Sequence, residues 1–92
     1  AAHLAEAFGT TLEIHHGGNS HNNVAQLQLM MALSNSLWFE VLLPDAAQKY
    51  GLKQDIDLQP DGTVSIAPFE APGVGAEIDF EMIRAKSLGV VS

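Results

Sequence analysis

The chain has 92 residues, no cysteine and a formal net charge of −7, from four basic and eleven acidic residues. This charge disfavours nucleic acid and anionic membrane surfaces as partners, because both would repel it. Without cysteine there is neither a disulfide framework nor a cysteine-based metal site, which fits a reducing cytoplasm. The hydrophobic share of 47% is typical of a folded protein, and no apolar run reaches the roughly 18 to 20 residues of a membrane span.

The first nine residues predict the last turns of a helix that ends at Gly9, because glycine commonly closes a helix. The chain begins without Met, so we expect it to be cut from something longer. A chain of this length also buries a smaller share of its surface than a longer one.

Residues 10–16 predict a short strand. Because side chains alternate along a strand, Leu12 and Ile14 share an apolar face, while Glu13 and His15 share the polar face with a threonine. A glycine-containing loop, Gly17-Gly18-Asn19-Ser20, follows. The loop precedes a helix and could hold an anion, although it matches no known phosphate-binding motif.

Residues 22–33 predict a helix that is apolar over most of its circumference, so we expect burial on several sides. Residues 37–43 form a nearly continuous apolar run that ends at Pro44, which is typical of a central strand in a parallel sheet. We expect Trp38 and the methionines in the core. Strand, helix and strand make a βαβ unit, so the fold class is α/β.

The rest of the chain predicts a β-rich tail. Residues 55–59 and 63–67 alternate on either side of Pro60-Asp61-Gly62, which predicts a hairpin. Pro72-Gly73-Val74-Gly75 is a second bend, and Asp79 predicts the cap of a short helix through Lys86. The boundary lies between Pro44 and Leu52, which divides the chain into residues 1–46 and 47–92.

Glu40 is the most informative single position. A carboxylate inside an apolar run costs several kcal/mol to bury unless it is paired, protonated or at a site. A functional role and a structural partner at the end of the strand are both open on these grounds.

The histidines suggest a site in which one of them acts alone. His15 and His16 point to opposite sides of a strand, so they cannot easily bind one metal ion with His3 or His21. His15 lies on the polar face at the end of the strand, where parallel α/β sheets collect catalytic groups, and imidazole titrates near neutral pH. The alternative is a histidine satisfied by loop carbonyls. For His21 we expect a role in capping the following helix.

The order of these motifs resembles the C-terminal part of enolase-superfamily enzymes, of the mandelate racemase, muconate lactonizing enzyme and acid-sugar dehydratase kind. The resemblance covers nearly the whole chain. Its residues are His15 with the glycine loop, Ala32-Leu33-Ser34-Asn35, Trp38-Phe39-Glu40, Asp61-Gly62-Thr63-Val64 and Ala71-Pro72-Gly73-Val74-Gly75-Ala76-Glu77-Ile78-Asp79.

The resemblance implies a fold, a (β/α)₈ TIM-type barrel. Residues 1–46 would supply the end of helix 6, strand 7, helix 7 and strand 8, and residues 47–92 would complete the barrel and its capping domain. The cofactor implied is Mg²⁺, held by acidic residues of strands three to five, and a lysine usually serves on strand two. All of those precede Ala1, so we expect no metal ligand in this chain.

The resemblance also implies roles for individual residues. The family's strand-seven histidine falls on His15, with His16 as the fallback, and would act as general base or acid at the carbon next to the substrate carboxylate. The aspartate that orients it lies outside the chain. The strand-eight glutamate falls on Glu40, which would hydrogen-bond the substrate carboxylate as it becomes an enediolate, from a protonated or strongly hydrogen-bonded state.

The function we expect is that of a Mg²⁺-dependent acid-sugar dehydratase, because the double histidine and the Gly-Gly-Asn loop resemble that branch. A racemase or epimerase of the same superfamily is the first alternative, and a non-catalytic acidic binding module is the second. Expected partners are an acid-sugar carboxylate, the remainder of the same polypeptide and further copies in a homo-oligomer. The segment alone is expected to be inactive.

Overall fold

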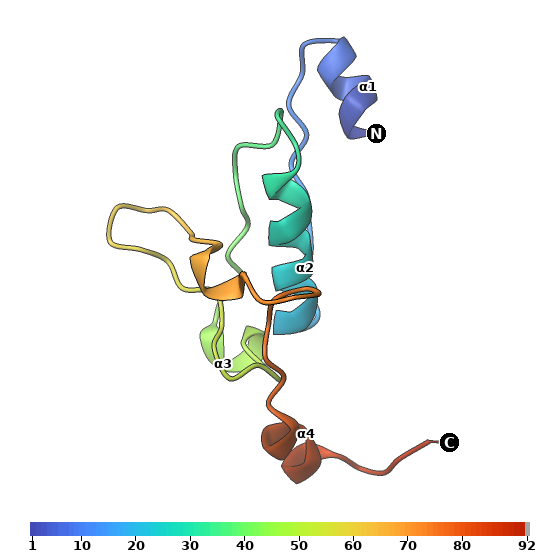
Figure 1. Cartoon of the computed structure of the whole chain (residues 1–92), viewed down its shortest axis with the longest axis vertical. Coiled ribbons are helices and arrows are strands. Elements are labelled where there is room, and N and C mark those ends of the chain that lie inside the picture. Colours follow the sequence, from blue (N-terminus) through green and yellow to red (C-terminus); the bar gives the residue numbers. More distant parts are fainter. Residues whose placement is uncertain (92) are drawn as a thin grey trace.

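The computed structural model describes residues 1–91 (Figure 1). These residues contain five helical elements and no strand, and the elements are α1 (Ala2–Ala7), α2 (Ser20–Met31), α3 (Asp45–Gln48), the 3₁₀ helix η1 (Ala67–Phe69) and α4 (Phe80–Lys86). The longest, α2, lies at the centre, with α1 beyond one end of it and α4 beyond the other (Figure 1).

Helix α2 confirms the helix that the apolar run predicted, and it begins two residues earlier. Its N-cap is Asn19, whose side-chain oxygen accepts a hydrogen bond of 2.8 Å from the Asn22 N–H. Such a bond satisfies one of the amide groups left free in a first helical turn. The expected capping role of His21 is therefore wrong, since His21 is already the second residue of the helix.

The core lies on one face of α2. Val24 and Leu27, three residues apart, pack with Leu52, Ile56 and Phe69 of the tail, and all five are buried. Spacing of three or four residues places side chains on the same helical face.

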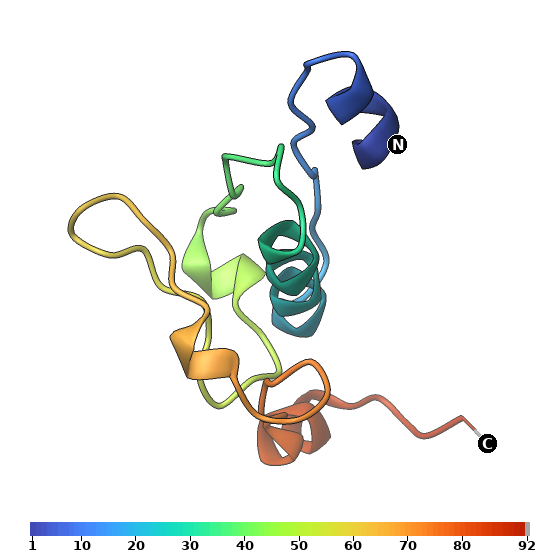
Figure 2. The same cartoon turned by 45° about the horizontal axis from the view of Figure 1, so that its top comes forward.

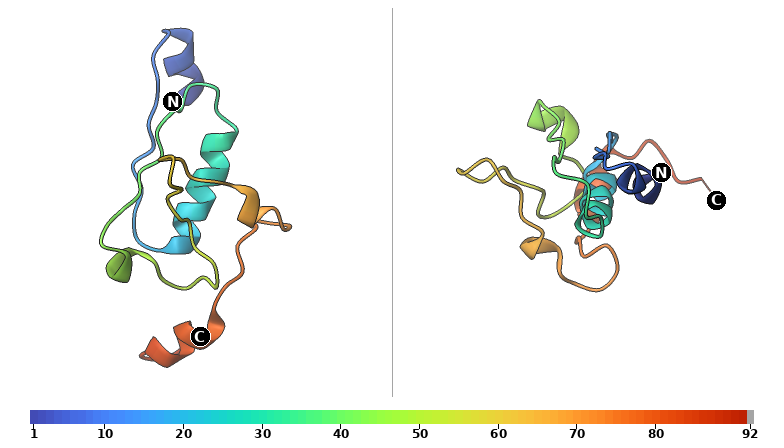
Figure 3. Two further views of the ribbon diagram at one scale, coloured as in Figure 1. Left: turned by 90° about the vertical axis from the view of Figure 1, so that its left-hand side faces the viewer. Right: turned by 90° about the horizontal axis from the view of Figure 1, so that it is seen from above.

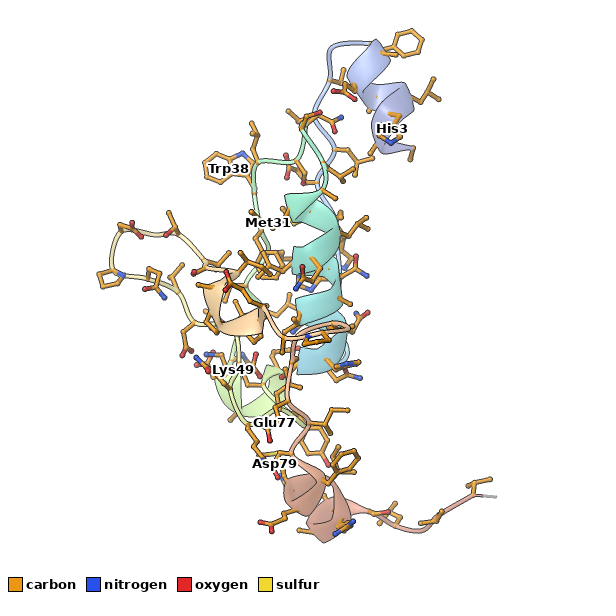
Figure 4. The ribbon with its side chains drawn as sticks, in the orientation of Figure 1. His3, Met31, Trp38, Lys49, Glu77 and Asp79 are labelled. Carbon is orange, nitrogen blue, oxygen red and sulfur yellow. The ribbon has the colours of Figure 1, made fainter. Side chains whose placement is uncertain are left out.

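The expected burial of α2 on several sides is wrong for the described residues, because the tail covers only one side of the helix. Leu29 and Met31 are 50% and 63% exposed, whereas Met30 is 7% exposed. Figure 4 shows Met31 at the end of α2 nearest the loop that leads to Trp38.

A polar contact fixes the second bend of the tail against α2. The Gln28 side-chain amide donates to the carbonyl oxygens of Phe69 and Val74, at 3.0 and 3.2 Å. Gly75 then folds back so closely that a Cβ atom there would overlap the Phe69 carbonyl group, and its φ is +83°. Both conditions require glycine at this position.

The two predicted strands of the βαβ unit are extended but unpaired. Segments 10–16 and 36–43 run side by side next to α2 (Figure 3, left), yet neither is a strand in the described chain. One backbone bond forms beside them, from the Leu12 N–H to the carbonyl of Asn35, the turn residue just before segment 36–43. A parallel ladder needs evenly spaced backbone bonds, and here side-chain carboxylates take up N–H groups of the facing segment. The predicted strands are therefore wrong for this structure.

The tail keeps its predicted turns and also lacks its predicted strands. Around residues 60–62 the Gln59 N–H donates to the Thr63 carbonyl at 2.8 Å, and a single antiparallel bridge joins Leu58 to Val64. This turn projects from the rest of the chain (Figures 1 and 2). Too few residues face each other for a longer ladder, because the chain turns into η1 soon after Val64. Ser92, the last residue of the predicted tail, lies outside the described residues.

The end of the tail confirms one sequence prediction in detail. The Asp79 carboxylate accepts a hydrogen bond of 3.0 Å from the Met82 N–H and caps α4, which ends at Lys86. A second single bridge, Leu52 to Ile78, ties this end to the core.

The chain is more open than a compact domain of its size. Its radius of gyration is 15.1 Å, against about 12 Å expected for a compact domain of this length. Leu37, Trp38 and Leu43 are 67%, 75% and 73% exposed, so the predicted core position of Trp38 is wrong. Figure 4 shows its side chain pointing away from α2.

Two glycines of the second bend form a matched pair of test positions. Gly73 and Gly75 have φ angles of +82° and +83°, but only Gly75 approaches another backbone group. We expect Gly73→Ala to lower the free energy of unfolding by roughly 1 kcal/mol through its left-handed backbone alone. Gly75→Ala should lose a further 1–3 kcal/mol or so from the overlap with Phe69. Urea denaturation of both variants measures the difference, and equal losses would contradict this packing.

Candidate acid–base site

The structure brings the two principal candidate residues into contact. His15 lies in segment 10–16 and Glu40 in segment 36–43, and His15 Nδ1 is 2.7 Å from Glu40 Oε2. An ionised carboxylate only accepts hydrogen bonds, so Nδ1 carries the proton and donates it. When the ring is neutral, that assignment leaves Nε2 as its basic nitrogen. The His15 side chain is 87% exposed and that of Glu40 39% exposed, so this nitrogen is accessible.

A shallow pocket of about 290 Å³ surrounds the pair. Glu13, Ile14 and His15 line it from one segment, and Trp38, Phe39 and Glu40 from the other. The pocket therefore combines two carboxylates, an imidazole and an exposed aromatic ring.

Glu13 is the site residue that sequence reasoning did not propose. Its carboxylate accepts hydrogen bonds from the backbone N–H groups of Trp38 at 2.9 Å and Leu37 at 3.5 Å. The signal that could have found it was the alternation of the segment, which already placed Glu13 on the same face as His15.

His16 lies on the other side of its segment, as alternation predicts. It is 6% exposed, its ring centroid is 4.8 Å from that of Phe39, and its Nδ1 is 2.9 Å from the Asn23 side-chain oxygen in α2. Its Nε2 is buried and has no hydrogen-bond partner among the described residues. The ring is not part of the pocket lining, whereas the His16 backbone N–H donates to Glu40 at 3.4 Å.

These contacts determine the charge of Glu40. Its partial desolvation raises the pKa of the carboxyl, but hydrogen bonds from the His15 ring and the His16 N–H, with the charges of both rings, outweigh it. The net result is a pKa below the ordinary value of 4.5. Glu40 is therefore ionised at neutral pH, so of the two states considered for it the strongly hydrogen-bonded carboxylate is the one present.

The described residues do not fit a magnesium site. In residues 1–91, no three or more His, Cys, Asp or Glu side chains come together in a way that could hold a metal ion. His3 lies on α1 beside Glu6 and His21 lies on α2, and neither lines the pocket. His15 and Glu40 are only two possible metal ligands, and they are already hydrogen-bonded to each other.

The lowered pKa of Glu40 generates a prediction for solution measurements. A carboxyl with a folded-state pKa below its unfolded value adds stability at pH values above the unfolded pKa, and this stability is lost as the pH falls through the folded pKa. Replacement of His15 by Gln should raise the pKa of Glu40 toward 4.5, since it removes a bond and a charge. Carboxyl ¹³C NMR titration measures this shift. His21→Gln is the matched control, and a Glu40 pKa unaffected by His15→Gln would refute the contact.

Among the described residues no helix has both the length and the apolar character to cross a membrane.

Comparisons with known proteins support a family assignment. Searches of curated proteins and of solved structures found no match. A family model described as enolase C-terminal domain-like matches residues 1–82, which is most of the chain. The chain therefore belongs to the enolase C-terminal domain-like family, within the enolase superfamily of enzymes.

Proposed function

We propose that this chain provides acid–base groups of an acid-sugar dehydratase, with His15 transferring protons at the carbon next to the substrate carboxylate. The single observation that carries the proposal is the 2.7 Å contact between His15 and Glu40. It gives an exposed imidazole a fixed orientation and a defined basic nitrogen, which a general base requires. Family membership supports enzyme chemistry of the lyase or isomerase class.

In this proposal Glu40 acts mainly on His15. As a carboxylate bonded to Nδ1–H, it holds the ring in one tautomer, and it stabilises the imidazolium that forms when Nε2 takes a proton. An ionised Glu40 repels a substrate carboxylate, so its expected contact with the developing enediolate would require protonation. We therefore propose orientation of His15 as the principal role of Glu40.

The proposed reaction is the removal of water from a 2,3-dihydroxy acid. Loss of the α-proton to a base leaves an electron pair that forms an enediolate, and its collapse expels the β-hydroxyl group. A proton from the His15 imidazolium makes this leaving group water, and the enol product then becomes a 2-keto acid. The double histidine and glycine loop favour this branch, while a racemase or epimerase would return the proton to the carbon instead.

The cofactor and partners in this proposal come from outside the described residues. Mg²⁺ would supply charge stabilisation of the enediolate, and groups outside the described residues would have to hold it. The exposed Leu37, Trp38 and Leu43 favour a surface that packs against the remainder of the polypeptide or a further copy. A non-catalytic acidic binding module is the competing function.

The first test is proton exchange at the substrate α-carbon in D₂O, followed by NMR with the full-length protein. We expect His15→Asn to abolish exchange on one face of the substrate, because asparagine cannot take up the proton. His21→Asn, a change on the outer surface of α2, is the matched control and should exchange normally. Exchange that persists in His15→Asn would exclude the role of His15, and absence of exchange in the wild type with any acid sugar favours the binding module.

The second test separates turnover from substrate binding. Glu40→Gln should lower kcat by about 10²-fold with a much smaller change in KM, because the amide orients the ring poorly and leaves the imidazolium without a counter-charge. Steady-state kinetics of Glu40→Gln beside Glu81→Gln, an exposed carboxylate of α4, measures both constants. An unchanged kcat in Glu40→Gln would contradict the proposal.

A further inference from the structure

We propose that Glu13 is a positioning residue that holds segment 36–43 in register with segment 10–16 and thereby delivers Glu40 to His15. The placement stands on contacts alone, and only its effect on turnover rests on the proposed function. Neither the composition of the chain nor the alternation of segment 10–16 assigns a role to Glu13.

The polar contacts between residues 10–16 and 35–40 have nearly the same offset in sequence, 23 to 25 positions. Three polar contacts each join residues that are 25 positions apart in the sequence. They are Thr10 O with Asn35 Nδ2 at 3.2 Å, Glu13 Oε2 with Trp38 N at 2.9 Å, and His15 Nδ1 with Glu40 Oε2 at 2.7 Å. Offsets this similar indicate two parallel segments in a single register.

Glu13 replaces the missing backbone ladder at the centre of this alignment. The described residues of the two segments share no backbone bond, and the nearest one, from the Leu12 N–H to the carbonyl of Asn35 just before segment 36–43, lies at the end away from the site. Between that bond and the His15 pair, the carboxylate of Glu13 accepts from two successive N–H groups. A slip of one residue would turn Glu40 to the opposite face of its segment, so the register decides whether the pair forms.

The same contacts make Glu13 a poor candidate for proton transfer. Oε1 accepts from the Leu37 N–H and Oε2 from the Trp38 N–H. Each carboxylate oxygen is therefore already an acceptor for a backbone N–H group. Glu13 therefore lines the pocket, but its carboxylate oxygens are hydrogen-bonded to the backbone of the facing segment.

The experiment uses full-length protein with Glu13→Ala and Glu13→Gln. Glu13→Ala removes both acceptors, so the carboxyl ¹³C titration of Glu40 should move toward the ordinary pKa of 4.5 as its contact with His15 loosens. We expect kcat to fall by about 10- to 100-fold with little change in KM, since a displacement of order 1 Å at a reacting group can cost about 10²-fold. Glu13→Gln retains an acceptor for Trp38 and should lie between Glu13→Ala and the wild type in both measurements.

The control is Glu77→Ala, which removes an exposed carboxylate paired with Lys53 and should leave the Glu40 titration unchanged. A Glu40 titration that does not respond to Glu13→Ala overturns the inference, even if the variant is less stable. If that variant does not fold, the wild type supplies the measurement, because the Trp38 amide proton shift should follow the ionisation of Glu13. A Trp38 amide that ignores this ionisation overturns the inference as well.

The outcomes also separate this inference from the proposed function. If Glu13→Ala shifts the Glu40 titration while His15→Asn still exchanges the α-proton, the register role stands and the dehydratase proposal fails. If His15→Asn abolishes exchange while Glu13→Ala leaves Glu40 undisturbed, the register role alone fails.

Discussion

The packing of one face of α2 against the tail is the interaction on which the other parts of this structure depend. Val24 and Leu27 contact Leu52, Ile56 and Phe69, and burial of such side chains supplies the main drive for folding. Polar groups of the same helix also form hydrogen bonds with the tail, and these bonds fix the relative orientation of helix and tail. The fully buried Ser20 hydroxyl donates to the Asp55 carboxylate and accepts from the Tyr50 N–H, while Gln28 fixes the bend near Val74. The helix and tail therefore form one unit.

The candidate site is attached to this unit through His16. Its ring contacts Asn23 on α2 and Phe39 on the facing segment, and its backbone N–H reaches Glu40. His16 is thus the buried neighbour of an exposed pair, and its neighbour in sequence, His15, faces the pocket. The two adjacent histidines have different surroundings because alternation places one side chain in the interior and the other at the surface. The fallback assignment to His16 remains a prediction, but its ring is far less accessible than that of His15.

Sequence patterns predicted the local features better than the paired ones. The α2 helix, the Asp79 cap of α4 and the turn near Gly62 depend on near neighbours in the sequence. The family resemblance, and no local pattern, suggested that His15 and Glu40 share a site, and the structure places them in contact. The strands of the βαβ unit depend on hydrogen-bond partners along both edges, which residues 1–91 do not provide. For the same reason no residue of the apolar run at 37–43, which suits a buried strand, is fully buried: Leu37, Trp38 and Leu43 are exposed and the residues between them are half-buried. Alternation placed Glu13 on the same face as His15, but its role was missed because a carboxylate that bonds backbone amides has no sequence motif of its own.

Trp38 gives the site an optical property of its own. It is the only tryptophan of the chain, it lines the pocket beside His15 and Glu40, and water surrounds most of its indole ring. The emission wavelength of indole depends on the polarity around it. A small acid or another stretch of polypeptide that covers the indole ring in this pocket displaces that water and shifts the emission maximum of Trp38 to shorter wavelength. The chain thus contains an intrinsic fluorophore at its candidate site.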